Sequence, residues 1–303
     1  MDITIDAVEK RYGSITALDG VSFDIPAGST FGVLGTNGAG KTTLFEILVG
    51  HAPPDAGRIT IGGVDTQAAG ASVRKRIGFL PEQVGFPGLL TGREVLRLQA
   101  QVREIPALEE TIDDALDAVG LAEDADRRVS GYSNGMQGRL GLAAALLADP
   151  AVLVLDEPTA GLDPRGVARF HEIINRIQES HETTIVMSSH VLSDIEQCCD
   201  AVAILHEGNV RLTGEVEELR SRPDGKTRMQ VEGTSPQGAN RLSAALADTT
   251  WQWLSDTTIE VKAAPEELVE VISALPAADV GDLTIDPQNG LEATFLAATS
   301  EVS

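Results

Sequence analysis

One segment limits the possible folds of this chain more than any other. Residues 35–42 have the sequence Gly-Thr-Asn-Gly-Ala-Gly-Lys-Thr, which fits the pattern G-x-x-x-x-G-K-[S/T]. An apolar stretch at 30–34 precedes it, and residues 42–49 have apolar side chains at helical spacing. In a strand, glycine-rich turn and helix of this order, backbone N–H groups and the helix dipole can hold phosphate oxygens. The sequence therefore predicts an α/β fold with a phosphate-binding loop.

The polar side chains of this loop have separate expected roles. Lys41 adds a positive charge toward the β- and γ-phosphates, Thr42 offers its hydroxyl oxygen to Mg²⁺, and Thr43 reaches an α-phosphate oxygen. The predicted nucleotide-binding residues of the segment are Gly35, Asn37, Gly38, Ala39, Gly40, Lys41, Thr42 and Thr43. A nucleoside triphosphate with magnesium is thus the expected ligand.

A second segment ends in two acids. Residues 152–155 are wholly apolar, which is typical of a strand buried on both faces of a parallel sheet, and Asp156 and Glu157 follow directly. Parallel strands present their carboxyl ends at the ligand-binding edge, where adjacent buried carboxylates are costly unless they are used. From the chemistry of phosphoryl transfer, we expect Asp156 to hold Mg²⁺ through its water shell. Glu157 is expected to orient and deprotonate the attacking water.

The remaining sequence predicts two domains. Residues from about 84 to 148 have helical periodicity and form a predicted helical subdomain inserted between strands. Turn-forming residues near 221–225 predict a boundary between a first domain, 1–221, and a second, 226–303. The second has the predicted order βαββαβ, a small α+β fold of the ferredoxin-like kind, with elements at 228–231, 239–246, 251–254, 258–261, 265–275 and 282–285.

The charge of the chain excludes some partners. There are 46 acidic and 23 basic residues, which give a formal net charge of -23. Because such a surface repels phosphate backbones, no nucleic acid partner is expected. We attribute the acidity to a surface suited to a cytoplasm of high salt, with an ordinary acidic protein as the alternative.

No signal sequence and no run of 18 apolar residues occurs, so a cytoplasmic protein is expected.

A third segment narrows the range of nucleotide hydrolases. Residues 132–136, Tyr-Ser-Asn-Gly-Met, lie just before an alanine-rich helical stretch and resemble the L-S-G-G-Q signature of the ABC transporter ATPase family. Ser133 and Gly135 match that signature, and the other three positions depart from it. The resemblance implies that Ser133 and Gly135 bind the γ-phosphate of a nucleotide held by the opposite subunit. Hydrolysis then requires a head-to-tail pair of nucleotide-binding domains.

Further residues resemble the family in the expected order. Tyr12 matches the aromatic residue on which adenine stacks, and Asp163 matches the loop that contacts the other subunit. His190 matches the switch histidine that touches the γ-phosphate and steadies the water. The loop that usually has a magnesium-sensing glutamine has Glu82 at that position and Gln83 one residue later. Either residue can serve, and Glu82 is taken as the metal-site candidate.

The resemblance covers about residues 1–221 and implies a P-loop NTPase fold of the ABC ATPase type, with ATP and Mg²⁺ as cofactors. It implies an ATPase subunit that dimerises around two ATP-Mg, with a homodimer expected and a mixed pair as the alternative, and drives conformational change in integral membrane permease subunits. The protein is then peripheral on the inner face of the cell membrane. The alternative is a non-transport ABC ATPase acting as a regulatory or remodelling factor. Within the exporter-type group, residues 80–82, 92–94 and 125–128 resemble the copper-processing ATPase of nitrous oxide reductase maturation.

Overall fold

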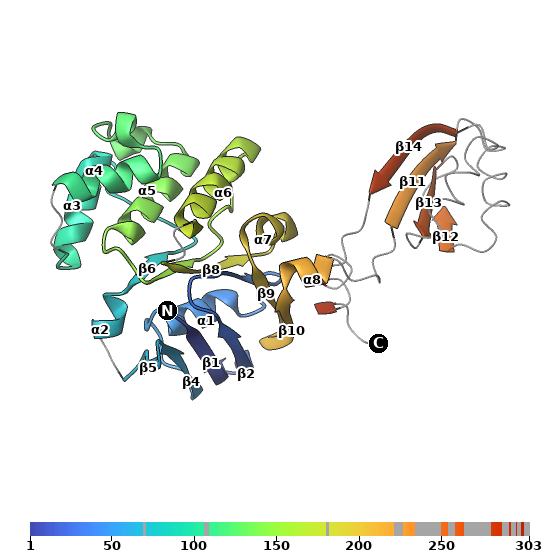
Figure 1. Cartoon of the computed structure of the whole chain (residues 1–303), viewed down its shortest axis with the longest axis horizontal. Coiled ribbons are helices and arrows are strands. Elements are labelled where there is room, and N and C mark those ends of the chain that lie inside the picture. Colours follow the sequence, from blue (N-terminus) through green and yellow to red (C-terminus); the bar gives the residue numbers. More distant parts are fainter. Residues whose placement is uncertain are drawn as a thin grey trace. The chain divides into compact units, whose positions relative to one another are not determined.

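The chain divides into two units, Met1–Glu215 and Val216–Ser303. Figure 1 shows the computed structural model. The structure describes residues 1–68, 71–105, 109–179, 182–220, 227–233, 250–253, 258–263 and 280–286, with the single positions Leu291, Phe295, Ala298 and Thr299.

A six-stranded sheet lies at the centre of the first unit, in the order β10-β9-β3-β8-β7-β6 (Figure 1). Its strands are β3 (Thr30–Leu34), β6 (Ile77–Leu80), β7 (Val152–Leu155), β8 (Thr184–Ser189), β9 (Ala201–His206) and β10 (Asn209–Glu215). All neighbouring pairs are parallel except β9 and β10. Every residue of β3, β7 and β8 is buried, as their apolar sequences predict. Because these three strands are adjacent and parallel, the segments that follow them meet at one edge of the sheet.

A second sheet is antiparallel and has the order β2-β1-β4-β5. Its strands are β1 (Ile3–Tyr12), β2 (Ile15–Ile25), β4 (Ala56–Ile61) and β5 (Val64–Asp65). Helix α1 (Lys41–Leu48) shares an apolar core with both sheets, in which Ile3, Phe45, Ile59 and Val154 are buried together. This core holds the beginning of α1, and therefore the phosphate loop, in a fixed place.

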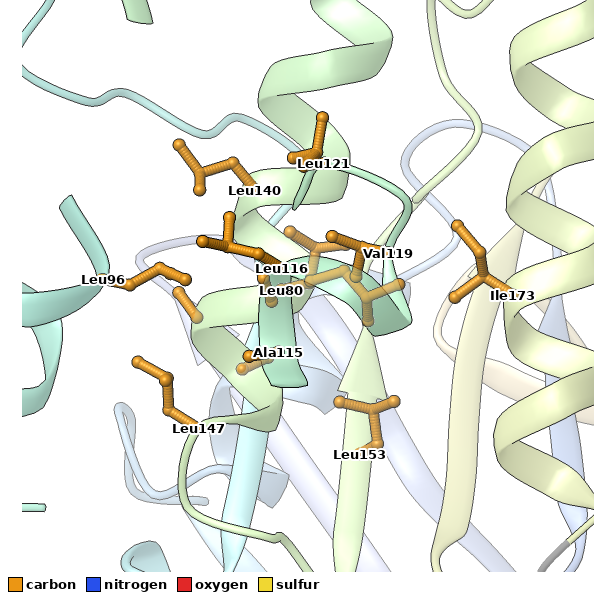
Figure 2. Packing of buried hydrophobic residues seen from close by; sticks show 14 of the residues in the cluster. Leu80, Leu96, Ala115, Leu116, Val119, Leu121, Leu140, Leu147, Leu153 and Ile173 are labelled. Atoms are coloured by element: carbon orange, nitrogen blue, oxygen red, sulfur yellow. The ribbon is translucent and has the colours of Figure 1, made fainter. Parts of the chain in front are cut away.

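Helices also cover the face of the six-stranded sheet that is opposite to α1. Those of the predicted helical insert are α3 (Gly92–Val102), α4 (Glu109–Ala118) and α5 (Asn134–Leu146). The remaining helices of the first unit are α2 (Ala71–Arg74), the 3₁₀ turns Ala122–Asp124 and Val129–Gly131, α6 (Pro164–Gln178) and α7 (Leu192–Cys198). Figure 2 shows how Leu96, Leu116 and Leu140 of the insert belong to one buried cluster with Leu153 of β7 and Ile173 of α6. The insert is thus packed onto the sheet by a continuous apolar core.

Three described helices of this unit are preceded by an N-cap residue whose side chain accepts a hydrogen bond from a backbone N–H of the first turn. Thr91 caps α3 in a capping box with Glu94, Ser133 caps α5, and Asp163 caps α6 before Pro164 at the first helical position. Ser133 and Asp163 are also predicted site residues, so helix initiation and the candidate site share side chains.

The second unit contains α8 (Val216–Arg220) and a sheet of β11 (Thr227–Gly233), β12 (Thr250–Trp253), β13 (Thr258–Ala263) and β14 (Val280–Asp286). The order is β12-β13-β11-β14, with every neighbouring pair antiparallel. Because β13 lies between β11 and β12, the order is that of a split βαβ arrangement. The predicted helices at 239–246 and 265–275 and the boundary at 221–225 lie outside the described residues, so the complete ferredoxin-like fold stays a prediction.

Across the described residues, no helix combines the length and the apolar character needed to cross a bilayer.

Candidate active site

The phosphate loop depends on its glycines at specific positions. Gly38 and Gly40 have φ angles of 84° and 106°, in the region that favours glycine. A Cβ atom on Gly35 would lie 2.5 Å from the carbonyl oxygen of Leu205, and one on Gly40 would lie 2.5 Å from that of Ala17. The loop is therefore packed against neighbouring backbone on one side, and α1 begins directly after it at Lys41.

Lys41, the first residue of α1, is only 6% exposed, and its side chain folds back over the phosphate loop that precedes it. Its ammonium group donates hydrogen bonds to the carbonyl oxygens of Gly35, at 2.6 Å, and Thr36, at 3.2 Å. The same Nζ lies 3.0 Å from Oε1 of Glu157. Lys41 thus connects the phosphate loop with the acid that follows β7.

Glu157 is held between two partners of different kinds. It is 8% exposed, and its φ angle of 46° is rare for a residue with a side chain. Oε2 lies 2.7 Å from Nδ1 of His190. Oε1 is buried and accepts no hydrogen bond from the described residues, although it forms the ion pair with Lys41. Oε1 therefore keeps lone pairs that a water molecule could bind.

Asp156 is 1% exposed and lies directly before the base candidate. Its Oδ1 accepts a hydrogen bond of 2.7 Å from the hydroxyl of Ser188, and its N–H donates to Leu80 at 2.8 Å. Ser188 also accepts a hydrogen bond of 2.8 Å from the N–H of Glu157. One serine of β8 thus orients both acids of the β7 segment. The sequence interpretation missed Ser188, whose only signal is a hydroxyl at the end of an apolar strand.

One pocket brings most of the predicted residues together. It is lined by Asn37, Gly38, Ala39, Gly40, Lys41, Thr42, Thr43, Glu82, Glu157, Ala160 and His190. Glu82, and not Gln83, belongs to this lining, whereas both line a neighbouring pocket beside Val84 and Asn134. Ala160 is an addition that the sequence did not single out.

The oxygen atoms around this pocket fit Mg²⁺. Within the described part of the chain, no group of three or more His, Cys, Asp or Glu side chains could hold a metal ion by itself. Magnesium, however, commonly uses one or two carboxylates together with substrate phosphates and water. Thr42 and Glu82 line the pocket, whereas Asp156 does not line it but directly precedes Glu157 of its wall. The hydroxyl of Thr42 and the carboxylates of Glu82 and Asp156 are the kind of hard oxygen donor that such a site requires.

Two groups of predicted residues lie away from the phosphate pocket. Tyr12, at the end of β1, is 48% exposed and does not line it; Nζ of Lys10 lies 5.5 Å from its ring centre. Ser133, Gly135 and Asp163 line a different pocket, which shares no lining residue with the phosphate pocket. The described residues of one chain therefore do not bring the signature segment to their own phosphate loop.

Tyr132, one of the departures from the signature, has a structural explanation. Its ring is buried, and its hydroxyl donates a hydrogen bond of 2.7 Å to the carbonyl oxygen of Asp124. A Cβ atom on Gly92 would lie 2.5 Å from that hydroxyl, so the glycine at the start of α3 leaves the space that the tyrosine fills. The substitution adds a satisfied polar contact to the core without altering the cap formed by Ser133.

A buried ion pair lies next to this site. Nε2 of His171, on α6, is 3.0 Å from Oδ1 of Asp194, on α7. The hydrogen bond to Asp194 raises the pKa of His171 above its ordinary value although burial opposes this. Burial raises the pKa of Asp194, but hydrogen bonds from His171, Thr159 and Ser189 together outweigh it and lower that pKa. Both pKa shifts therefore favour the charged form of their group, in keeping with an ion pair.

Comparison with known proteins places this site in a family. The family model described as ABC transporter matches residues 18–160. The bacitracin transport ATP-binding protein BcrA of Enterococcus faecalis is 32% identical over 258 residues, which are 85% of this chain and 81% of that protein. The chain belongs to the ABC transporter ATP-binding family. The linearmycin resistance ATP-binding protein LnrL of Bacillus subtilis is 32% identical over 303 residues, which cover 96% of each chain. The similarity to LnrL therefore extends into the second unit of this chain.

A solved structure supports the same assignment. CbiO1 of Clostridium perfringens, part of the ABC transporter complex CbiONQ, has a TM-score of 0.64 and 28% identity over 73% of this ABC chain and 90% of its own. The predicted family, P-loop NTPase fold, transporter function and ATPase activity are thereby confirmed. The chain is an ATP-binding and ATP-hydrolysing subunit of an ABC transporter. The narrower likeness to the copper-processing ATPase stays a prediction.

Proposed function

We propose that two copies of this chain close head to tail around two ATP-Mg and that closure drives a membrane permease. The proposal is supported above all by the position of Glu157, whose carboxylate lies between Lys41 and His190 on the wall of the phosphate pocket. A carboxylate oxygen that has an ion pair with Lys41 but accepts no hydrogen bond from the described residues, beside a phosphate-binding loop, is suited to accept a proton from a water molecule.

Each group of the pocket has a proposed part in binding. The N–H groups of the loop and the start of α1 face the β- and γ-phosphates, and Lys41 exchanges its carbonyl contacts for phosphate oxygens. Thr43 adds a contact to the α-phosphate, and Tyr12 stacks on the adenine. Mg²⁺, held by Thr42 and Asp156 with Glu82 nearby, would neutralise phosphate charge.

The hydrolytic step uses Glu157 and His190. Oε1 of Glu157 accepts the proton of the attacking water, while Oε2 is held by Nδ1 of His190. Because Nδ1 faces the carboxylate, Nε2 on the opposite side of the ring is left to contact the γ-phosphate. The backbone of Glu157 is fixed by its N–H bond to Ser188, so the carboxylate needs little rearrangement.

A second copy supplies the rest of the site. Ser133 and Gly135 at the N-terminus of α5 bind the γ-phosphate of the nucleotide on the partner, and Asp163 contacts the partner near its own site. This arrangement explains why the signature pocket and the phosphate pocket of one chain share no residue. A homodimer is the simplest form of such a pair.

The membrane partner gives the chain its place in the cell. We place it in the cytoplasm, peripheral on the inner face of the membrane through integral permease subunits. Domains at 1–221 and 226–303 are proposed for the ATPase and an accessory unit. The relatives named for bacitracin transport and linearmycin resistance favour export of a small molecule as the transport task. Nucleic acid is not a proposed partner.

Glu157→Gln tests this function. The change removes the proton acceptor but keeps the size of the side chain, so Mg²⁺-dependent ATP hydrolysis should fall at least about 100-fold. ATP should still bind, and the fraction of dimer in ATP should increase in size-exclusion chromatography. Glu207→Gln is the matched control because Glu207 also has a positive φ, 47°, and loses the same charge at an exposed site. Hydrolysis at the parent rate by Glu157→Gln would show that the base assignment is wrong.

A further inference from the structure

Asp194 contacts two loops of the site at once, although it belongs to neither. The residue is 2% exposed, and its Oδ2 accepts a hydrogen bond of 2.6 Å from the hydroxyl of Thr159. The hydroxyl of Ser189 lies 3.0 Å from the same oxygen. Thr159 follows β7 and Ser189 ends β8. A single carboxylate oxygen therefore connects the ends of two neighbouring parallel strands.

The two hydroxyls lie next to the residues that perform hydrolysis. Thr159 comes two residues after Glu157, and the N–H of Ala160 donates to the carbonyl oxygen of Glu157 at 3.0 Å. Ser189 directly precedes His190, and its Oγ accepts a hydrogen bond of 2.9 Å from the N–H of Val191. One hydroxyl that Asp194 contacts therefore lies in the turn after Glu157, and the other directly precedes His190 and holds the turn at that residue.

The charge of Asp194 is balanced inside the protein. Nε2 of His171 lies 3.0 Å from Oδ1, and Nδ1 of the same ring lies 2.8 Å from Oε1 of Gln197. Both ring nitrogens face acceptor oxygens, an arrangement that fits a doubly protonated imidazole. A buried carboxylate is costly without a partner of opposite charge, and His171 supplies that partner. Neither charge has a part in the hydrolytic step described above.

We propose that Asp194, with His171 as its counter-charge, is a positioning residue that sets the spacing between Glu157 and His190. Thr159 fixes the Glu157 loop and Ser189 fixes the His190 turn, so that Oε2 and Nδ1 meet at 2.7 Å. The inference rests on the proposed roles of Glu157 and His190. It predicts that the cluster controls the rate of hydrolysis and not the affinity for nucleotide, because the phosphate loop has none of these contacts.

Steady-state kinetics of Asp194→Asn test this inference on the full chain with ATP and Mg²⁺. Asparagine keeps the shape but loses the charge and one acceptor, so the Glu157 and His190 loops should lose their fixed spacing. The value of kcat should fall roughly 10- to 100-fold, as expected for a small displacement of a reacting group. KM for ATP should change less than about twofold, since Asp194 contacts no residue of the phosphate loop and its loss displaces only the groups that act on the water.

The control must weaken α7 without touching the cluster. Ile195→Val removes one methyl group from the neighbouring buried residue, which lies on the same helix and takes no part in the cluster. Its kcat should stay within about twofold of the parent. Thr159→Val and Ser189→Ala remove one hydroxyl each, and both should lower kcat by less than Asp194→Asn does. If Asp194→Asn does not fold, these two variants test the positioning role instead, because each should lower kcat while KM for ATP stays almost unchanged.

The outcomes separate this inference from the proposed function. If Asp194→Asn keeps the parent kcat while Glu157→Gln has lost it, the positioning role is wrong and the base assignment stands. If Ile195→Val lowers kcat as much as Asp194→Asn, the cluster has only a structural role and the inference is overturned. If Glu157→Gln keeps full activity, the proposed function fails first, and the positioning role fails with it.

Discussion

Glu157 is held in an unfavourable backbone conformation at the centre of the site. Residues with a side chain at positive φ cost on the order of 1–3 kcal/mol and persist only where the surrounding contacts determine them. At Glu157, the N–H bond to Ser188 and the contacts of the carboxylate with Lys41 and His190 hold the backbone in this conformation. The strained backbone therefore belongs to the residue whose orientation the proposed chemistry needs most.

The same scale gives a prediction about pH. The pKa of His171 is higher in the folded protein than in the unfolded chain, so protonated His171 stabilises the folded state. This contribution to the free energy of unfolding is fully present below the pKa of the unfolded chain and is lost as pH rises through the pKa of the folded protein. The lowered pKa of Asp194 has the opposite consequence, and its contribution is lost only in acid. His171→Gln should therefore lower the free energy of unfolding more at about pH 6 than at about pH 9.

Urea unfolding of parent and variant at the two pH values measures this difference. Equal losses at both values would contradict the assignment of His171 as a buried cation.

At the scale of elements, helix N-termini serve two purposes in this fold. Ser133 and Asp163 satisfy free N–H groups of α5 and α6 and also belong to the segments assigned to the subunit contact. Thr91 caps α3 in the same manner but lines none of the pockets described above. Comparing these caps can therefore separate the stabilising effect of capping from an effect on nucleotide binding.

Thr91→Ala should lower the free energy of unfolding by about 1 kcal/mol, because it removes the side-chain half of the capping box with Glu94. KM for ATP should be unchanged. Thr91→Ser keeps the hydroxyl and is the matched control, with stability expected close to the parent. Urea denaturation and steady-state kinetics of the two variants provide both measurements. A loss of stability as large in the serine variant would exclude the cap as its cause.

For the whole molecule, the acidic excess is the property that local structure does not explain. Ion pairs such as Arg93 with Asp113 and Arg97 with Glu109 neutralise a few of the exposed acids in the described residues. With a net charge of -23, most of the surface nevertheless repels itself at low ionic strength. Salt should relieve this repulsion, since the Debye length shrinks to about 3 Å at 1 M.

We therefore expect the melting temperature to rise from low salt to molar KCl by more than about 3 °C, or about 1 kcal/mol for a unit of this size. Thermal unfolding followed by circular dichroism at several KCl concentrations provides the measurement. A melting temperature that does not depend on salt would remove the hypothesis of adaptation to a high-salt cytoplasm.

Much of the fold and part of the candidate site could be predicted because they depend on local patterns. The glycine spacing of 35–42 and the apolar run before Asp156 and Glu157 identify a phosphate loop and an acid strand within a few residues of sequence. The choice between Glu82 and Gln83 was left open, because a shift of one residue in a loop depends on how that loop packs. Only the structure places Glu82, and not Gln83, on the wall of the phosphate pocket.

The sequence by itself determined which residues follow the buried strands and which positions require glycine, because strand burial and backbone conformation depend on neighbours along the chain. Tertiary structure alone decided that Lys41 would meet Glu157, that Ser188 would orient both acids, and that Asp194 would reach two loops. These partners lie on separate segments and meet because β3, β8 and β7 are adjacent and parallel. Strand order is set by the packing of the whole core, so no local pattern could have specified these contacts.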